Sequence, residues 1–196
     1  FEQAGGLMNI YAKEKTNRML MGWEVPASWF QSLNAMFIIF LGTSVAAYWA
    51  NKKLKGKVAT SLYKMIIGLI IMGTGFFFMS AASSQFETQG SSAMYWLVLA
   101  YLFHTVGELC ISPVALSYIT KLAPLKYGSL MMGIYFAMTG FGNKLAGLLG
   151  ESAEGLGEFT VFTGIALFCV IFGAIVMLFR KKLEILTHGA EDDEHE

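Results

Sequence analysis

The segment Phe103–Leu116, FHTVGELCISPVAL, places a carboxylate inside a long apolar stretch. An ionised acid such as Glu108, near the centre of a membrane helix, costs roughly 2.5 to 3.5 kcal/mol. Ser112 lies four residues later, on the same helical face. Pro113 cannot donate a hydrogen bond to the carbonyl of Leu109, so we expect a bent helix with that carbonyl free. An acid, a hydroxyl and a free carbonyl on one face would suit the ammonium group of a ligand.

Glu108 also has other interpretations. It could be a neutral, hydrogen-bonded acid that bridges two helices. His104 lies one turn earlier and could form a metal pair with Glu108, but the sequence offers no third ligand, and Cys110 lies on a different face. A hydrogen-bonded or proton-sensing His104 fits better, because an unperturbed histidine titrates near pH 6.5. An intramembrane hydrolase built on His104 and Glu108 lacks a nucleophile, base and orienting group that would act together.

Two more polar residues lie in apolar segments. Glu2 follows Phe1 in FEQAGG, and Asn34 lies within FQSLNAMFIIF. A membrane asparagine often joins two helices by hydrogen bonding. Three expected helices would nevertheless each place one polar group at depth, which is typical of a transport pathway. A scaffold subunit would not need them.

The composition indicates a membrane protein. Of the 196 residues, 55% are hydrophobic and 14% are charged, whereas soluble domains are about 25% charged. The mean hydropathy is +0.54. The net charge of zero argues against a nucleic-acid partner. Cys110 and Cys169 both lie in apolar runs, so we expect buried thiols and neither a disulfide framework nor a metal cluster.

Apolar segments long enough to cross a membrane divide the chain. Five are predicted, at residues 26–50, 61–83, 93–122, 127–149 and 158–179, and residues 1–12 are expected to be the outgoing end of a sixth helix. Because the chain opens in this way, we expect a fragment whose N-terminal portion is missing. Gly140 and Gly147 are expected to let helices approach closely. Residues 183–196 are expected to form an acidic cytoplasmic tail.

The basic residues predict the orientation of the helices. On one expected side of the membrane, the sequence has four basic residues, of which the last lies near a helix end: Lys13, Lys15, Arg18 and Lys144. The other side carries ten: Lys52, Lys53, Lys55, Lys57, Lys64, Lys121, Lys126, Arg180, Lys181 and Lys182. The ten-residue side and the tail are therefore expected in the cytoplasm.

Three motifs resemble one transporter family. FEQAGG, SLNAMFI and GELCISPVALSYITKLAP are similar to the proton-dependent oligopeptide transporters (POT/PTR) of the bacterial PepT kind, which belong to the major facilitator superfamily. The resemblance extends to about Phe179. It implies an all-α polytopic membrane protein, namely the C-terminal six-helix half of such a transporter with its first helix truncated. It also implies a multi-pass protein of the bacterial cytoplasmic (inner) membrane.

The resemblance implies a substrate site. Asn34 and Glu108 match the pair that receives the amino terminus of a peptide, and Ser112 matches the serine beside that acid. Tyr135 falls where many relatives have tryptophan, in a side-chain pocket. The implied substrates are di- and tripeptides, carried into the cytoplasm by proton symport.

The resemblance also implies residues for coupling and gating. Glu2 matches an acid that pairs with a lysine of the N-terminal six-helix half and takes part in proton coupling. Glu14 matches an acid that closes the outer gate against a basic residue of that half. The proton is the coupling ion, with no other cofactor, and the bilayer and the other half are the partners. Transport of nitrate, an amino acid or a drug-like solute is the alternative, although the retained acid Glu108 favours peptides.

Overall fold

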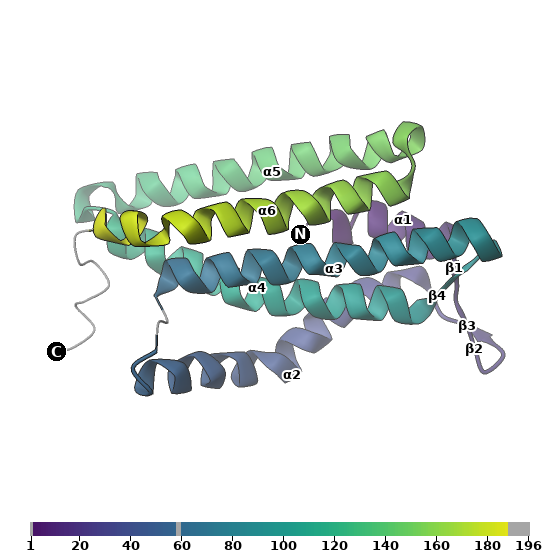
Figure 1. The fold of residues 1–196 in the computed structure, drawn as a ribbon, viewed down its shortest axis with the longest axis horizontal. Coiled ribbons are helices and arrows are strands. Elements are labelled where there is room, and N and C mark those ends of the chain that lie inside the picture. The colour runs from purple at the N-terminus through teal and green to yellow at the C-terminus, as the bar shows by residue number, and fades with distance from the viewer. Residues whose placement is uncertain (1, 58–59, 188–196) are drawn as a thin grey trace.

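The structure is a computed structural model that describes residues 2–57 and 60–187, and it is a bundle of long helices (Figure 1). The helices are η1 (Glu2–Ala4), α1 (Leu7–Glu14), α2 (Ala27–Leu54), α3 (Ser61–Gln89), α4 (Met94–Leu122), η2 (Leu125–Tyr127), α5 (Gly128–Leu156) and α6 (Glu158–Ile185). Four of them, α2, α3, α4 and α6, are long and apolar enough to cross a membrane. Helix α5 is equally long, but Asn143 and Lys144 interrupt its apolar sequence.

Short strands connect the helices at one end of the bundle. They are β1 (Thr16–Asn17), β2 (Met19–Leu20), β3 (Trp23–Glu24) and β4 (Ser92–Ala93). Strand β1 pairs in parallel with β4, so that Thr16 lies opposite Ser92. Strands β2 and β3 form an antiparallel hairpin. The pairing of β1 with β4 ties the end of α1 to the connection between α3 and α4.

Helix α3 packs against both α4 and α6, and glycines make both contacts close. A Cβ atom added to Gly68 would lie 2.7 Å from the carbonyl oxygen of Gly107 on α4, and one on Gly107 would lie 2.7 Å from that of Gly68. On the side of α6, a Cβ atom on Gly73 would lie 2.7 Å from Cβ of Cys169. Small residues allow membrane helices to approach in this way.

The glycines of α5 behave differently from those of α3. A Cβ atom added to Gly140 or Gly147 would have no atom of the described residues within 4 Å, apart from its own helix and chain neighbours. The expectation that these two glycines allow close packing is therefore wrong within the described part of the chain. The reason is the position of α5, which lies at the side of the bundle next to α6 (Figure 1).

The start of the chain differs from the single helix expected over residues 1–12. Phe1 lies outside the described residues, Glu2–Ala4 forms a 3-10 turn, and α1 begins only at Leu7. Gly6 has φ −99° and ψ −109°, which is not helical. Two adjacent glycines are poor helix formers, and they separate the turn from α1. Glu2 therefore lies in a turn that Gly5 and Gly6 separate from α1, which we call the Gly5–Gly6 interruption.

Other helix ends extend beyond the predicted ones. Helix α5 continues to Leu156, so Lys144 lies near its middle and not near its end. Helix α6 continues to Ile185, three residues into the segment expected to be a tail. The rest of that expected tail, from residue 188, lies outside the described residues.

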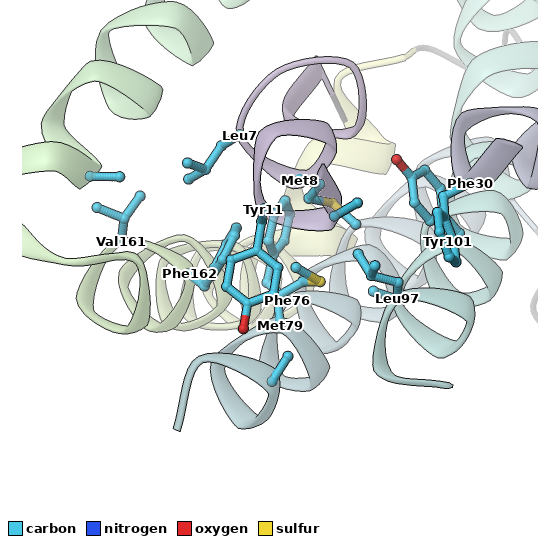
Figure 2. Close-up of a cluster of buried hydrophobic side chains, with 14 of the residues drawn as sticks. Leu7, Met8, Tyr11, Phe30, Phe76, Met79, Leu97, Tyr101, Val161 and Phe162 are labelled. Atoms are coloured by element: carbon cyan, nitrogen blue, oxygen red, sulfur yellow. The ribbon is translucent and has the colours of Figure 1, made fainter. Parts of the chain in front are cut away.

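A cluster of buried side chains joins α1 to the five long helices α2 to α6 (Figure 2). Its labelled members are Leu7, Met8, Tyr11, Phe30, Phe76, Met79, Leu97, Tyr101, Val161 and Phe162. The ring of Tyr11 meets that of Phe162 edge-on at 5.8 Å. The hydroxyl of Tyr101 donates to the carbonyl of Ala4 at 2.8 Å, just before the Gly5–Gly6 interruption. The chain is thus fixed to the bundle on both sides of the Gly5–Gly6 interruption.

Candidate functional site

Asn34 of α2 and Glu108 of α4 are in direct contact. Asn34 Nδ2 donates a hydrogen bond to Glu108 Oε2 at 3.1 Å. Both residues are partly buried. No lysine, arginine or histidine of the described residues forms an ion pair with Glu108. The carboxylate therefore keeps acceptor capacity for a cation from outside this part of the chain.

Thr105, which the sequence reasoning missed, orients the amide of Asn34. Its hydroxyl lies 2.6 Å from Asn34 Oδ1 and 2.8 Å from the carbonyl oxygen of Tyr101, and it can donate to either. Thr105 has no exposed surface. When the hydroxyl donates to Oδ1, the NH₂ group of Asn34 must point toward Glu108. Thr105 lies three residues before Glu108 on one helical face, which is the signal that could have found it.

The two other expected substrate residues are Ser112, on the same helix as Glu108, and Tyr135, on α5. Ser112 is one turn beyond Glu108 on α4 and is partly buried. Tyr135 is on α5, where its ring packs edge-on against Phe136 with centroids 5.6 Å apart. Among the predicted site residues, the described structure brings only Asn34 and Glu108 into hydrogen-bond contact.

His104 is buried between α3 and α4. Its ring centroid is 4.4 Å from that of Phe76, and a Cβ atom on Gly75 would lie 2.6 Å from His104 Cδ2. Neither ring nitrogen has a hydrogen-bond partner among the described residues. The expectation of a hydrogen-bonded His104 is therefore wrong for this part of the chain. The described residues give no support for the metal pair: Glu108 contacts Asn34, and this part of the chain contains no group of three metal-ligating side chains.

Glu2 is exposed and faces α5. With its amide oriented to satisfy both neighbours, Asn143 donates to Glu2 Oε1 at 3.1 Å and to the carbonyl of Thr139 at 3.3 Å. The next residue, Gln3, donates through Nε2 to the carbonyl of Ala146 at 2.7 Å. Turn η1 is thus anchored to α5 by two side chains. The sequence reasoning did not identify Asn143 as a partner of Glu2.

A cavity of about 420 Å³ lies between the start of the chain and α5. Glu2, Gln3 and Asn143 line it together with Glu151 and Glu154 of α5. The carboxylate of Glu2 is thus next to a space that solvent can fill, and it is also held by an amide donor.

Glu14 is the last residue of α1, and its side chain is exposed. The following residue, Lys15, forms an ion pair with Glu158 at the start of α6, with Nζ 2.5 Å from Oε1. The backbone N–H of Ser92 donates to the carbonyl of Lys15 at 2.9 Å. These contacts fix the end of α1, so the exposed side chain of Glu14 projects from a helix end that is held in place.

Comparison with protein families gives a match over most of the chain. The PTR2 model, described as the POT family, matches residues 1–155. A peptide transporter of Yersinia enterocolitica, YePEPT, is 36% identical over 97% of this chain. A di-/tripeptide transporter of Lactococcus lactis subsp. cremoris is 26% identical over 93% of it. This chain spans 38% of the first of these relatives and 37% of the second.

Solved structures agree with the sequence comparison. A crystal structure of a peptide transporter POT in complex with sulfate has a TM-score of 0.84 at 30% identity, covering 92% of this chain and 36% of that one. A mutant peptide transporter POT in complex with alafosfalin has a TM-score of 0.83 at 28% identity, covering 92% of this chain and 37% of that one. These matches confirm the predicted fold class, an all-α membrane bundle of the transporter type. The chain therefore belongs to the POT family.

Proposed function

We propose that this chain is the C-terminal six-helix half of a proton-coupled symporter of di- and tripeptides. The named relatives are peptide transporters, and the chain spans a little over a third of their length. In this proposal the N-terminal half supplies the other side of the central cavity. The protein lies in the bacterial cytoplasmic membrane, with the basic loops and the C-terminal tail in the cytoplasm. The proton is the coupling ion and no other cofactor takes part.

The observation that carries the proposal is the contact between Asn34 and Glu108. A partly buried carboxylate without a cationic partner in the described residues is costly unless a cation reaches it. The ammonium group of a peptide is such a cation. Asn34 is expected to hold the carboxylate in position by donating to Oε2, while the remaining lone pairs of Glu108 accept the ammonium protons. Ser112 and Tyr135 are proposed to contact the same bound peptide.

Proton coupling is assigned to Glu2 and the outer gate to Glu14. The side chain of Glu2 is exposed, held by Asn143 and adjacent to a cavity, so it can meet a lysine of the facing half and also exchange protons. Protonation would remove the attraction between the halves and allow them to rock. Glu14 ends a helix that is fixed by the ion pair of Lys15, which gives a gate contact a rigid support.

A different solute is the main alternative, because the superfamily fold carries many substrates. Nitrate would call for a basic residue where Glu108 stands, and the acid argues against it. An amino acid has an ammonium group too, so Glu108 alone does not exclude it. An intramembrane hydrolase is set aside, since the named relatives are transporters.

Uptake into proteoliposomes tests the substrate class. The full-length transporter is reconstituted, an inward proton gradient is imposed, and entry of labelled dialanine is followed. We expect accumulation that collapses with a protonophore and that is inhibited by trialanine at tenfold excess. Alanine or nitrate at the same excess should leave it unchanged. Equal inhibition by alanine would contradict a peptide substrate.

The variant Thr105→Val tests the amide orientation proposed for Asn34. Valine keeps the shape of threonine but cannot donate to Asn34 Oδ1, so the amide can turn away from Glu108. The loss of one net hydrogen bond, about 0.5 to 1.5 kcal/mol, predicts dipeptide binding that is about 2- to 12-fold weaker. Binding to the full-length protein is measured by calorimetry. Thr105→Ser, which keeps the hydroxyl, is the control and should bind nearly as well as the wild type.

A further inference from the structure

The end of the bundle at the connection between α2 and α3 is strongly basic. From Val25 to Phe86 the sequence contains five lysines and no aspartate or glutamate. Two cations from different helices meet at one ring: the ammonium of Lys52 is 4.3 Å from the ring centroid of Tyr63, and the guanidinium of Arg180 is 5.3 Å from it. Glu184 pairs with Arg180 at 3.4 Å. Among the described residues, positive charge therefore exceeds negative charge at this end.

Two grooves separate the C-terminal half of α2 from its neighbours, and that half of α2 visibly diverges from α3 and α4 (Figure 1). One groove, of about 400 Å³, is lined mainly by apolar side chains, with Lys52 among them. The other, of about 360 Å³, is lined by Lys53, Lys64 and apolar residues of α2 and α4. Trp49, which is 8% exposed, lines both. We call them the Trp49 grooves.

We propose that the Trp49 grooves bind an anionic phospholipid, with its phosphate at Lys52 and Lys64 and its acyl chains along the grooves. An apolar groove with lysines at its membrane-interface end matches a molecule with an anionic head and apolar chains. Aromatic rings such as Tyr48 and Trp49 are typical of that interface. A zwitterionic lipid fills the grooves equally well but does not neutralise the lysines. A peptide would leave its backbone polar groups unpaired against the apolar linings.

The position of the grooves suggests what the lipid does. Leu109 and Pro113 of α4 line the second groove, and Gly42 and Ala46 of α2 face them there. The same two helices carry Asn34 and Glu108, whose hydrogen bond joins α2 to α4 closer to the other end. A bound lipid would thus fill the space where α2 and α4 separate. It would support the helix pair without touching the peptide site.

Native mass spectrometry of the full-length transporter in detergent tests the proposal. Dioleoylphosphatidylglycerol is the anionic probe, and dioleoylphosphatidylcholine is the neutral comparison. We expect a clear preference for the anionic lipid. Each lysine near an anionic lipid contributes about 1 kcal/mol, so Lys52→Gln/Lys64→Gln should weaken that binding about 30-fold. The matched control is Lys55→Gln/Lys57→Gln, which removes the same charge from the connection between α2 and α3 at residues that do not line the grooves, and it should keep the preference.

A second variant tests the grooves without changing any charge. Ala46→Trp places a large ring in the second groove and should also lower retention of phosphatidylglycerol. Glycerol phosphate, which carries an anionic phosphate but no acyl chains, should not displace phosphatidylglycerol from the wild type. The proposal is overturned if the wild type shows no anionic preference, or if the Lys52/Lys64 variant keeps it. Equal losses in both lysine pairs would indicate general attraction to a basic loop, and would overturn the groove assignment as well.

Discussion

Replacing Glu108 with glutamine is expected to remove most binding of ordinary dipeptides while the protein still folds. Glutamine has nearly the same shape, and its side-chain oxygen can still accept the hydrogen bond from Asn34 Nδ2. What is lost is the negative charge that attracts the peptide ammonium. A hydrogen bond to a charged group contributes about 1.5 to 3 kcal/mol, which corresponds to a loss of about 12- to 150-fold in affinity. Calorimetry on the full-length transporter measures it directly.

Two comparisons make the result specific to the ammonium group. An N-acetylated dipeptide has no ammonium, so its weak binding should change much less in Glu108→Gln. Glu87→Gln removes a carboxylate from an exposed position near the end of α3 and should bind dipeptides like the wild type. If Glu108→Gln binds ordinary dipeptides with wild-type affinity, Glu108 is not the amine anchor.

The contact between Asn34 and Glu108 illustrates how far the sequence leads. Each is a polar residue within an apolar segment, so the sequence alone singles out both. Their family resemblance pairs them, and the structure adds that Asn34 donates directly to Glu108. Thr105 was not found, because a threonine in an apolar helix is common and its hydroxyl often bonds its own backbone. Its second contact, with Asn34, depends on how α2 packs against α4.

The helices that are long and apolar enough to cross a membrane, α2, α3, α4 and α6, were predictable from apolar length, but their ends were not. Segments such as NKKL at the end of α2 are polar yet helical, because a membrane helix can continue into the interface beyond its apolar core. The partner of Glu2 was also hidden, since Asn143 is far from it in sequence and meets it in a turn that Gly5 and Gly6 separate from α1. The close contacts of the glycines on α3 depend on which faces of neighbouring helices pack together, and the spacing of glycines in the sequence does not reveal which faces these are.

Replacing Glu2 with glutamine is expected to abolish peptide uptake driven by a proton gradient, yet to leave peptide exchange at least partly intact. Glutamine imitates the protonated acid permanently, so no proton can be taken up or released at this position. Its side-chain oxygen can still accept the hydrogen bond from Asn143, which keeps turn η1 against α5. Counterflow needs no net proton movement, and the substrate contact at Glu108 is unchanged. Both activities are measured with the full-length protein in the same liposomes.

The two assays together separate coupling from binding. Glu154→Gln is the matched control, because it removes a carboxylate from the wall of the same cavity without removing the acid held by Asn143, and it should keep both activities. Normal gradient-driven accumulation by Glu2→Gln would remove Glu2 from the proton path. Loss of both activities would leave only a structural or binding role. Loss of accumulation with retained exchange is the result that a proton-coupling acid requires, because only the step that moves protons is then blocked.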